Sequence, residues 1–177
     1  PHFKRFDKEH PGRHNVIIWP FVSAFWADAA HSQGFKDIFS FELQNLADLA
    51  LKSNNCFYEI YNSETGAVDG GWQSDHQWNS VHDQTWSATG YIRMIFNNLF
   101  GMRFTPEGLT FNPDVELLNE YGVEKLSNLR YLNGRLNIIV SGKGTKLAAV
   151  KVNGKIQSVK KPIAPADGIT QIELIIK

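Results

Sequence analysis

The chain has 177 residues, of which 42% are hydrophobic and 20% are charged, with 18 Lys and Arg against 18 Asp and Glu. This composition excludes a disordered chain, and no run of about 20 uncharged apolar residues is present to form a membrane-spanning helix. Zero net charge argues against nucleic acid as the main partner, and a single cysteine, Cys56, excludes an internal disulfide and a multi-cysteine zinc site.

The two halves of the sequence differ in composition. Residues 1–100 hold 7 basic and 11 acidic side chains, all five tryptophans and all six histidines, whereas residues 101–177 hold 11 basic and 7 acidic side chains. We predict a helical domain over residues 1–101 and a β domain over residues 102–177. Any chemistry is expected in the helical domain, because it holds the large rings and the side chains that titrate near neutral pH.

Helical periodicity marks three segments of the first domain. Pro20 suits a first helical turn and Gly34 a helix end, which predicts helices over residues 20–34 and 35–53, folded as an antiparallel hairpin. A third helix is predicted over residues 85–101. The apolar residues at helical spacing are Phe21, Val22, Phe25, Trp26, Ala29 and Ala30 in the first helix, Phe35, Ile38, Phe39, Leu43, Leu46, Leu49 and Ala50 in the second, and Ala88, Tyr91, Ile92, Ile95, Phe96 and Leu99, all on one face, in the third.

A long loop is predicted over residues 54–84, between the second and third helices. Loops of this length inside a compact domain are usually functional or mobile. Glu59 lies between Tyr58 and Tyr61, and a carboxylate beside aromatic rings suits a sugar-binding cleft. The alternative is a surface glutamate in an ordinary loop. Trp72 follows in a glycine-rich stretch of the same segment.

The sequence gives no support for a metal, a phosphate-binding loop or a reactive thiol. Asp75, His76, His82 and Asp83 are potential ligands, but their spacing fits no zinc or calcium loop, so neither a metal nor another cofactor is expected. The glycine-rich run lacks the preceding strand and following helix that a phosphate loop needs. Cys56 has no basic neighbour and no helix N-terminus to lower its pKa, and it is not expected to be a nucleophile.

The second domain is predicted to be an antiparallel sheet. Asn133-Gly134 and Asn153-Gly154 are residue pairs that two-residue hairpin turns prefer, and Gly142-Lys143-Gly144 offers a third connection. The pattern predicts an antiparallel β-sandwich-like meander, and with the helices an α+β fold class. The expected strands are residues 109–111, 125–132, 135–140, 146–152, 155–159 and 170–176.

Three motifs occur in an order that resembles a known group of enzymes. They are His14-Asn15-x-x-x-Trp19-Pro20-Phe21, Tyr58-Glu59-x-Tyr61-x-x-x-Thr65-Gly66 and Gln84-x-Trp86-Ser87-Ala88. Together they resemble the C-terminal part of six-hairpin, (α/α)6-barrel glycoside hydrolases, in the bacterial mannosyl-oligosaccharide glucosidase-like, trehalase-like and amylo-α-1,6-glucosidase-like group. Residues 99–113 resemble the exit from that barrel into a terminal β domain.

The resemblance implies an inverting hydrolase of α-linked gluco- or manno-oligosaccharides. Glu59 falls at the position of the general base, and the family's general acid lies on an earlier hairpin that no segment here matches. The chain is therefore expected to need the upstream remainder of the barrel as its partner, to be inactive alone, and to be periplasmic or secreted. The substrate-binding residues implied are His14, Asn15, Trp19, Tyr58, Tyr61, Trp72, Gln84 and Trp86.

Two functions of other classes remain open. One is a non-catalytic carbohydrate-binding module that uses the β domain, although that domain lacks tryptophan and offers only Tyr121 and Tyr131 as candidate rings. The other is a helical interaction domain, which would self-associate through apolar helix faces left open by missing hairpins.

Overall fold

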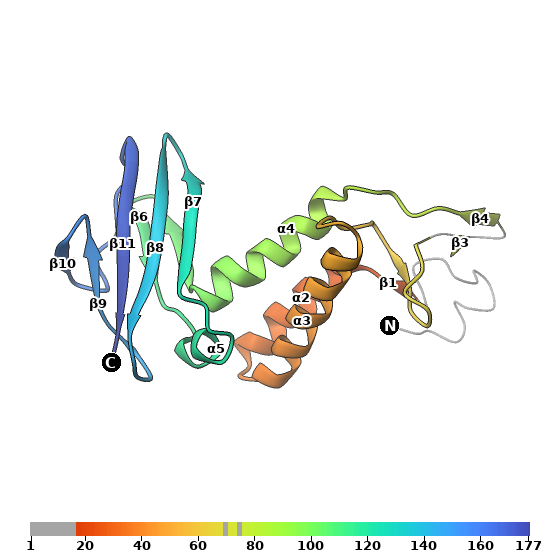
Figure 1. The fold of residues 1–177 in the computed structure, drawn as a ribbon, viewed down its shortest axis with the longest axis horizontal. Helices are drawn as coiled ribbons and strands as arrows, with labels where there is room; N and C mark the ends of the chain where they lie inside the picture. The colour runs from red at the N-terminus through yellow and green to blue at the C-terminus, as the bar shows by residue number, and fades with distance from the viewer. Residues whose placement is uncertain (1–16, 69–70, 74–75) are drawn as a thin grey trace. The chain divides into compact units, whose positions relative to one another are not determined.

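The computed structural model describes residues 17–68, 71–73 and 76–177 (Figure 1). The chain divides into two compact units between Met94 and Ile95. The first unit holds the helices and the second a five-stranded sheet, which confirms the α+β class predicted from the sequence. The motifs singled out above lie in the first unit.

A tight turn at Gly34 joins the first two helices. Helix α2 spans Pro20–Ser32 and helix α3 spans Lys36–Lys52. Gly34 has a φ of +83°, its N–H donates to the His31 carbonyl at 3.0 Å, and the Phe35 N–H donates to the Ala30 carbonyl at 2.9 Å. These two bonds satisfy carbonyls at the helix end and form the Schellman motif that glycine favours. The predicted helical hairpin is confirmed.

Small residues form the contact between α2 and the third helix, α4 (Thr85–Arg93). Ala24 and Ala27 of α2 are fully buried, and a Cβ built on Gly90 of α4 would lie 3.0 Å from the Ala24 Cβ. Val22, Phe25 and Trp26, which belong to the apolar stripe of α2, are 42%, 46% and 53% exposed. Periodicity locates a stripe, but side-chain size decides which stripe allows a close backbone approach.

The other predicted helix faces need smaller corrections. In α3, Phe39, Leu43 and Leu46 are buried, whereas Phe35, at the N-cap, is 56% exposed. Helix α4 continues as a π-helical segment, Met94–Leu99, instead of remaining α-helical to residue 101. The buried residues of α4 are Ser87 and Gly90, whereas Ile92, on the predicted apolar face, is 44% exposed.

Short strands interrupt the predicted loop over residues 54–84. β1 (Ile17–Ile18) pairs antiparallel with β2 (Tyr61–Asn62), and β3 (Gly71–Gln73) pairs antiparallel with β4 (His76–Trp78). The Asn62 side-chain oxygen accepts from the N–H groups of Glu64 and Thr65, both at 2.9 Å. This turn reverses the chain directly after β2.

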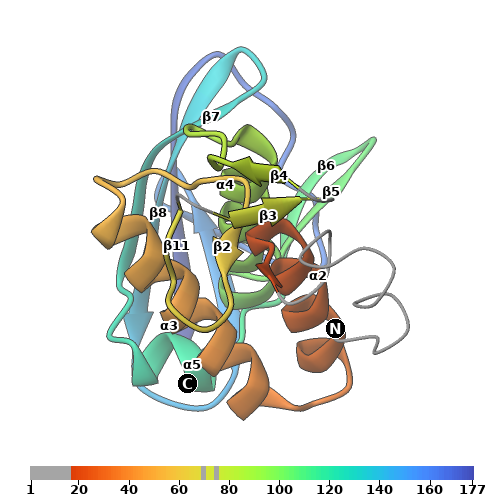
Figure 2. The same ribbon diagram turned by 90° about the vertical axis from the view of Figure 1, so that its right-hand side faces the viewer.

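The second unit contains one mixed sheet and a separate hairpin. The hairpin consists of β5 (Met102–Thr105) and β6 (Gly108–Phe111), and a short helix, α5, spans Val115–Glu120. The sheet order is β10-β9-β11-β8-β7. Figure 2 shows the β5–β6 hairpin apart from the sheet. The sheet strands are β7 (Lys125–Tyr131), β8 (Gly134–Gly142), β9 (Leu147–Val152), β10 (Lys155–Gln157) and β11 (Gly168–Ile176).

The expectation of an entirely antiparallel sheet is wrong at one strand pair. β11 is parallel to β8 and antiparallel to β9, and it separates the two strands that the predicted meander would have paired. Ile172, Leu174 and Ile176 of β11 are at most 2% exposed. A strand this apolar gains most from a central position with a neighbour on each side.

Candidate functional site

Backbone pairing brings together segments that lie far apart in the sequence. Strand β1 pairs with β2, which places the start of α2 beside the end of the Tyr58–Tyr61 motif. The Glu59 N–H donates to the Val81 carbonyl at 2.9 Å, and the Gln84 N–H donates to the Phe57 carbonyl at 2.8 Å. The segment around Glu59 is thus bonded to both of the other described motif segments.

An aromatic cluster lies where α2 and α4 begin. The Trp19 and Trp86 rings meet edge to face with centroids 5.8 Å apart, and Phe21 stacks on Trp86 at 5.7 Å with 20° between the ring planes. A shallow cavity of about 380 Å³ is lined by Phe21, Gln84, Thr85, Trp86 and Thr89. Trp86 remains 42% exposed, so part of the ring is open to a ligand.

The two tyrosines that flank Glu59 have different surroundings. Tyr61 is 2% exposed, and its hydroxyl accepts from the Tyr58 N–H at 3.0 Å and lies 3.4 Å from the Ser53 Oγ. Tyr58 is half-buried, and its ring meets the Tyr61 ring edge to face at 6.1 Å. Tyr61 therefore holds the backbone of the motif in place, whereas Tyr58 reaches the surface.

Glu59 is half-buried, and its backbone is fixed by the bond to residue 81. Within the described part of the chain, its carboxylate has no hydrogen bond or ion pair. A carboxylate with such freedom is able to accept a proton from a water or a hydroxyl group.

Three predicted site residues are not fully placed by the structure. His14 and Asn15 lie outside the described residues. Trp72 lies in β3, where its backbone pairs with Gln77 of β4, and its side chain is outside the description. Of the eight predicted substrate-binding residues, the structure brings Trp19, Tyr58, Tyr61, Gln84 and Trp86 to one end of the helical unit.

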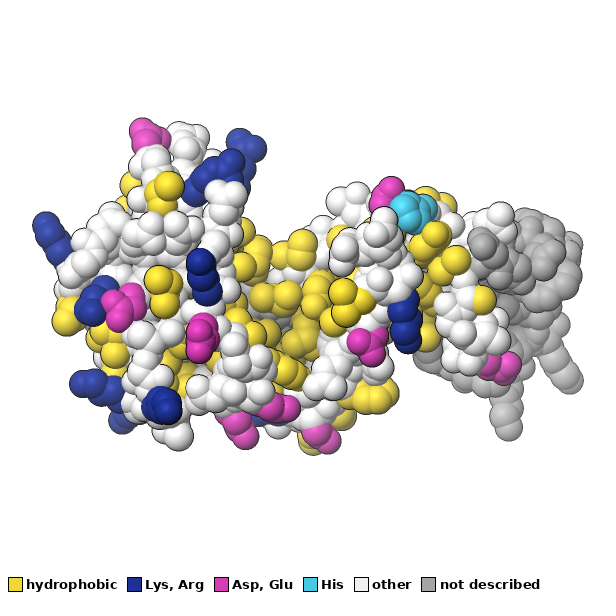
Figure 3. Space-filling view, viewed as in Figure 1, with side chains coloured by type: hydrophobic (Ala, Val, Ile, Leu, Met, Phe, Trp, Pro, Cys, Tyr) yellow, Lys and Arg dark blue, Asp and Glu magenta, His cyan; other side chains and the backbone are white. Residues whose placement is uncertain are grey.

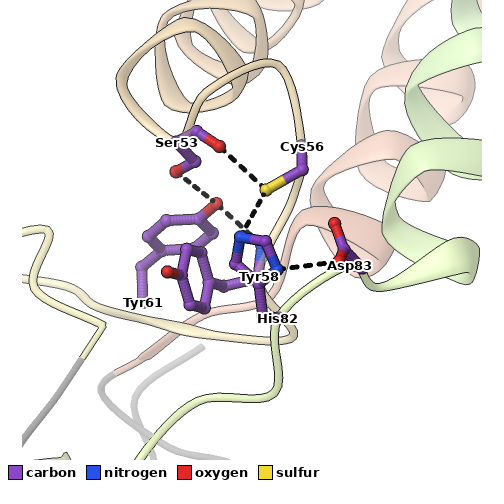
Figure 4. A network of polar contacts seen from close by, with 6 residues as sticks. All are labelled: Ser53, Cys56, Tyr58, Tyr61, His82 and Asp83. Carbon is purple, nitrogen blue, oxygen red and sulfur yellow. Dashed lines mark hydrogen bonds and ion pairs between the residues drawn. The ribbon is translucent and has the colours of Figure 1, made fainter.

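A polar cluster that the sequence did not predict lies beside the Tyr58–Tyr61 motif (Figure 4). The Cys56 thiol donates to the Ser53 carbonyl at 2.8 Å and its Sγ lies 3.0 Å from His82 Nε2. His82 Nδ1 lies 2.8 Å from an Asp83 carboxylate oxygen. The expectation that Cys56 lacks a basic neighbour is therefore wrong, because the fold closes the 26-residue separation between Cys56 and His82.

The cluster brings together two of the predicted potential metal ligands with a third that was not considered. One sulfur, one nitrogen and one oxygen atom of Cys56, His82 and Asp83 all lie within 4.8 Å of one another. The carboxylate contacts the ring nitrogen opposite the one that faces the sulfur. The contact with Asp83 thus orients the His82 imidazole toward the Cys56 thiol. In the sequence, only the His82-Asp83 pair signals it.

Comparison with protein-family models finds no match, and comparison with curated protein sequences finds no significant match. Among the described residues, no helix is both long enough and apolar enough to cross a membrane.

Proposed function

We propose that the chain is part of a glycoside hydrolase of α-linked gluco- or manno-oligosaccharides, with Glu59 as the general base of an inverting reaction. The observation that carries the proposal is the convergence of the Trp19, Glu59 and Trp86 segments through backbone pairing and ring contacts. Without that convergence, the three motifs would be unrelated fragments of sequence. With it, a free carboxylate lies on a segment bonded to the one that carries an exposed indole ring.

Each described residue then has a distinct role. Trp86 offers part of its ring to the face of a sugar, and Gln84, which lines the same cavity, offers an amide to a hydroxyl group. Glu59 takes a proton from the water that attacks the anomeric carbon. The general acid, about 6.5–9.5 Å from the base in inverting enzymes, comes from outside the matched motifs, so the chain alone is expected to bind sugar and to turn it over little.

Exposed apolar side chains on the helices support a partner for this unit. Val22, Phe25 and Trp26 of α2, Phe41 of α3 and Ile92 of α4 are each more than 40% exposed. In Figure 3, hydrophobic side chains gather over α2, α3 and α4. Surfaces of this kind are usually covered. In the proposed enzyme, further helices of the (α/α)6 barrel cover them.

Sugar binding by the purified chain tests the proposal. Tryptophan fluorescence is followed during titration with maltose-type and α-mannose-type oligosaccharides, and saturable binding is expected in the micromolar to millimolar range. Trp86→Ala should weaken binding about tenfold or more, whereas Trp26→Ala, which removes another exposed indole outside the cavity lining, should not. Glu59→Gln should retain binding and remove any hydrolysis. Absence of saturable binding, or equal loss in both tryptophan variants, would contradict the proposal.

The same exposed helix faces favour a second candidate, an interaction module that self-associates. It predicts a dimer or larger assembly by light scattering, and Phe41→Ser in α3 should weaken it, because Phe41 is 67% exposed. If light scattering shows a monomer at all concentrations, self-association is excluded, and covering by other helices of the proposed barrel remains the explanation for these exposed faces.

A further inference from the structure

Cys56 has the surroundings of an activated nucleophile. The Asp83 carboxylate only accepts hydrogen bonds, so the His82 nitrogen that contacts it, Nδ1, carries the proton. The other ring nitrogen, Nε2, is then an acceptor that faces the sulfur at 3.0 Å. A nucleophile within hydrogen-bond distance of a base, and a base oriented by a third group, are the geometric signature of covalent catalysis.

The imidazole is also held by a ring contact. Tyr58 meets His82 edge to face with ring centroids 4.7 Å apart. The single thiol proton has two alternative acceptors, the Ser53 carbonyl at 2.8 Å and His82 Nε2 at 3.0 Å, and its transfer to the base requires that it turn from the carbonyl to the imidazole. Backbone, carboxylate and ring contacts together fix the relative positions of sulfur and base.

Cys56 also borders an apolar cavity. It has a volume of about 420 Å³ and is bordered by α3, by the segment that carries Cys56, and by α4. Among the described residues, no charged side chain lines it. Cys56 therefore contacts a base through its sulfur and also borders a hollow suited to a hydrocarbon chain. The lining residues are Ala47, Ala50, Leu51, Asn55, Cys56, Phe57, Ala88, Tyr91 and Ile92.

We propose that Cys56 accepts an acyl group from an acyl thioester, with the acyl chain in this cavity. The Sγ–H proton passes to His82 Nε2 as sulfur attacks the carbonyl carbon. A new S–C bond forms, the thioester C–S bond breaks, and the leaving thiolate takes the proton from His82. One thioester is exchanged for another, so no oxidant, reductant or further reactant is needed. The proposal is independent of the glycoside hydrolase assignment.

Chain-length selectivity distinguishes this site from an ordinary exposed thiol. The purified chain is incubated with octanoyl-coenzyme A or acetyl-coenzyme A, and the mass of the intact protein is followed with time. One octanoyl group should be added, faster than one acetyl group, and hydroxylamine should remove it. Cys56→Ser should abolish the addition. Equal rates for the two donors, or unchanged labelling of Cys56→Ser, would overturn the proposal.

Substitutions test the role of the base and the role of the cavity in acyl transfer separately. His82→Gln should slow both donors about 10²-fold, since general-base catalysis contributes 10²–10⁴-fold. Asp83→Asn should slow both less, whereas Asp48→Asn, an exposed carboxylate on α3, should have no effect. Ala47→Leu, which fills part of the cavity, should slow octanoyl transfer more than acetyl transfer. Circular dichroism verifies folding, and the comparison of donors on the unmodified chain does not depend on any variant.

A metal role is the alternative that the same protein can reveal. Co²⁺ alone is added to the purified chain and the sulfur-to-metal absorption band is recorded. No band is expected. A strong band that both Cys56→Ser and His82→Gln remove, together with absence of acyl transfer, would assign the cluster to a metal and overturn the proposal.

Discussion

Gly90 of α4 lies in the contact with α2, so substituting it tests how closely these two helices pack. Alanine is favoured over glycine by about 1 kcal/mol inside a helix. At Gly90, however, the new Cβ would lie 3.0 Å from the Ala24 Cβ, and overpacking of this kind costs about 1–3 kcal/mol. We expect Gly90→Ala to destabilise the unit by about 0–2 kcal/mol, the difference between these two effects.

A second substitution separates the two effects. In the Ala24→Gly background, the nearest remaining atom is the Phe21 Cα at 3.6 Å, an ordinary contact, so Gly90→Ala should stabilise by about 1 kcal/mol. The coupling between the two substitutions should then be about 1–3 kcal/mol. Urea unfolding followed by tryptophan fluorescence reports this unit, because all tryptophans lie before residue 101. Equal stabilisation in both backgrounds would refute the described contact between α2 and α4.

Three further predictions concern charge and backbone conformation. Burial raises the pKa of Glu42, so the contribution of Glu42 to the free energy of unfolding falls as pH rises through that pKa. Glu42→Gln should therefore raise Tm at pH 7 but not at about pH 4. An equal gain in Tm at both pH values would contradict this. The hydrogen bond from Lys151 lowers the pKa of Glu173 in the folded state. The stability that this carboxylate contributes is therefore present above its unfolded-state pKa, near 4.3, and is lost as pH falls through the folded-state pKa. Glu173→Gln should therefore weaken the acid dependence of Tm, and an unchanged profile would count against the pairing. Gly101→Ala should lower the free energy of unfolding by about 3 kcal/mol or more, since φ is +59° and a backbone carbonyl oxygen would lie 1.8 Å from the new Cβ. Gly122→Ala, with φ +60° but open space around the Cβ, should lower it by about 1–2 kcal/mol. Similar urea midpoints for the two variants would disprove the clash at Gly101.

The helices illustrate what the sequence could predict. Pro20 and Gly34 act on the backbone within a few residues, so the helix ends and the hairpin were predictable. The buried face of α2 was not, because the choice between the aromatic stripe and the stripe containing Ala24 depends on which helices lie beside it. Gly90 was a local sign of close approach.

The sheet and the polar cluster depend on contacts between distant residues. The Asn153-Gly154 turn was predictable, because both residues adopt the positive φ that the turn requires. The insertion of β11 between β8 and β9 was not predictable, because the residues of a strand do not determine locally which strands it pairs with. In the same way, the tyrosine-flanked Glu59 was visible as a motif, whereas the approach of His82 to Cys56 required the pairing of residues 57–59 with 81–84.

The position of β11 also sets an order of assembly. Strands β7 and β8, and strands β9 and β10, are paired locally, but only β11 joins one pair to the other. The sheet therefore cannot be completed until residues 168–176 are available, and its closing contacts span long stretches of chain, which slows folding. Without β11, two hairpins would remain, each with an unpaired edge that a separate strand of the same sequence is suited to fill.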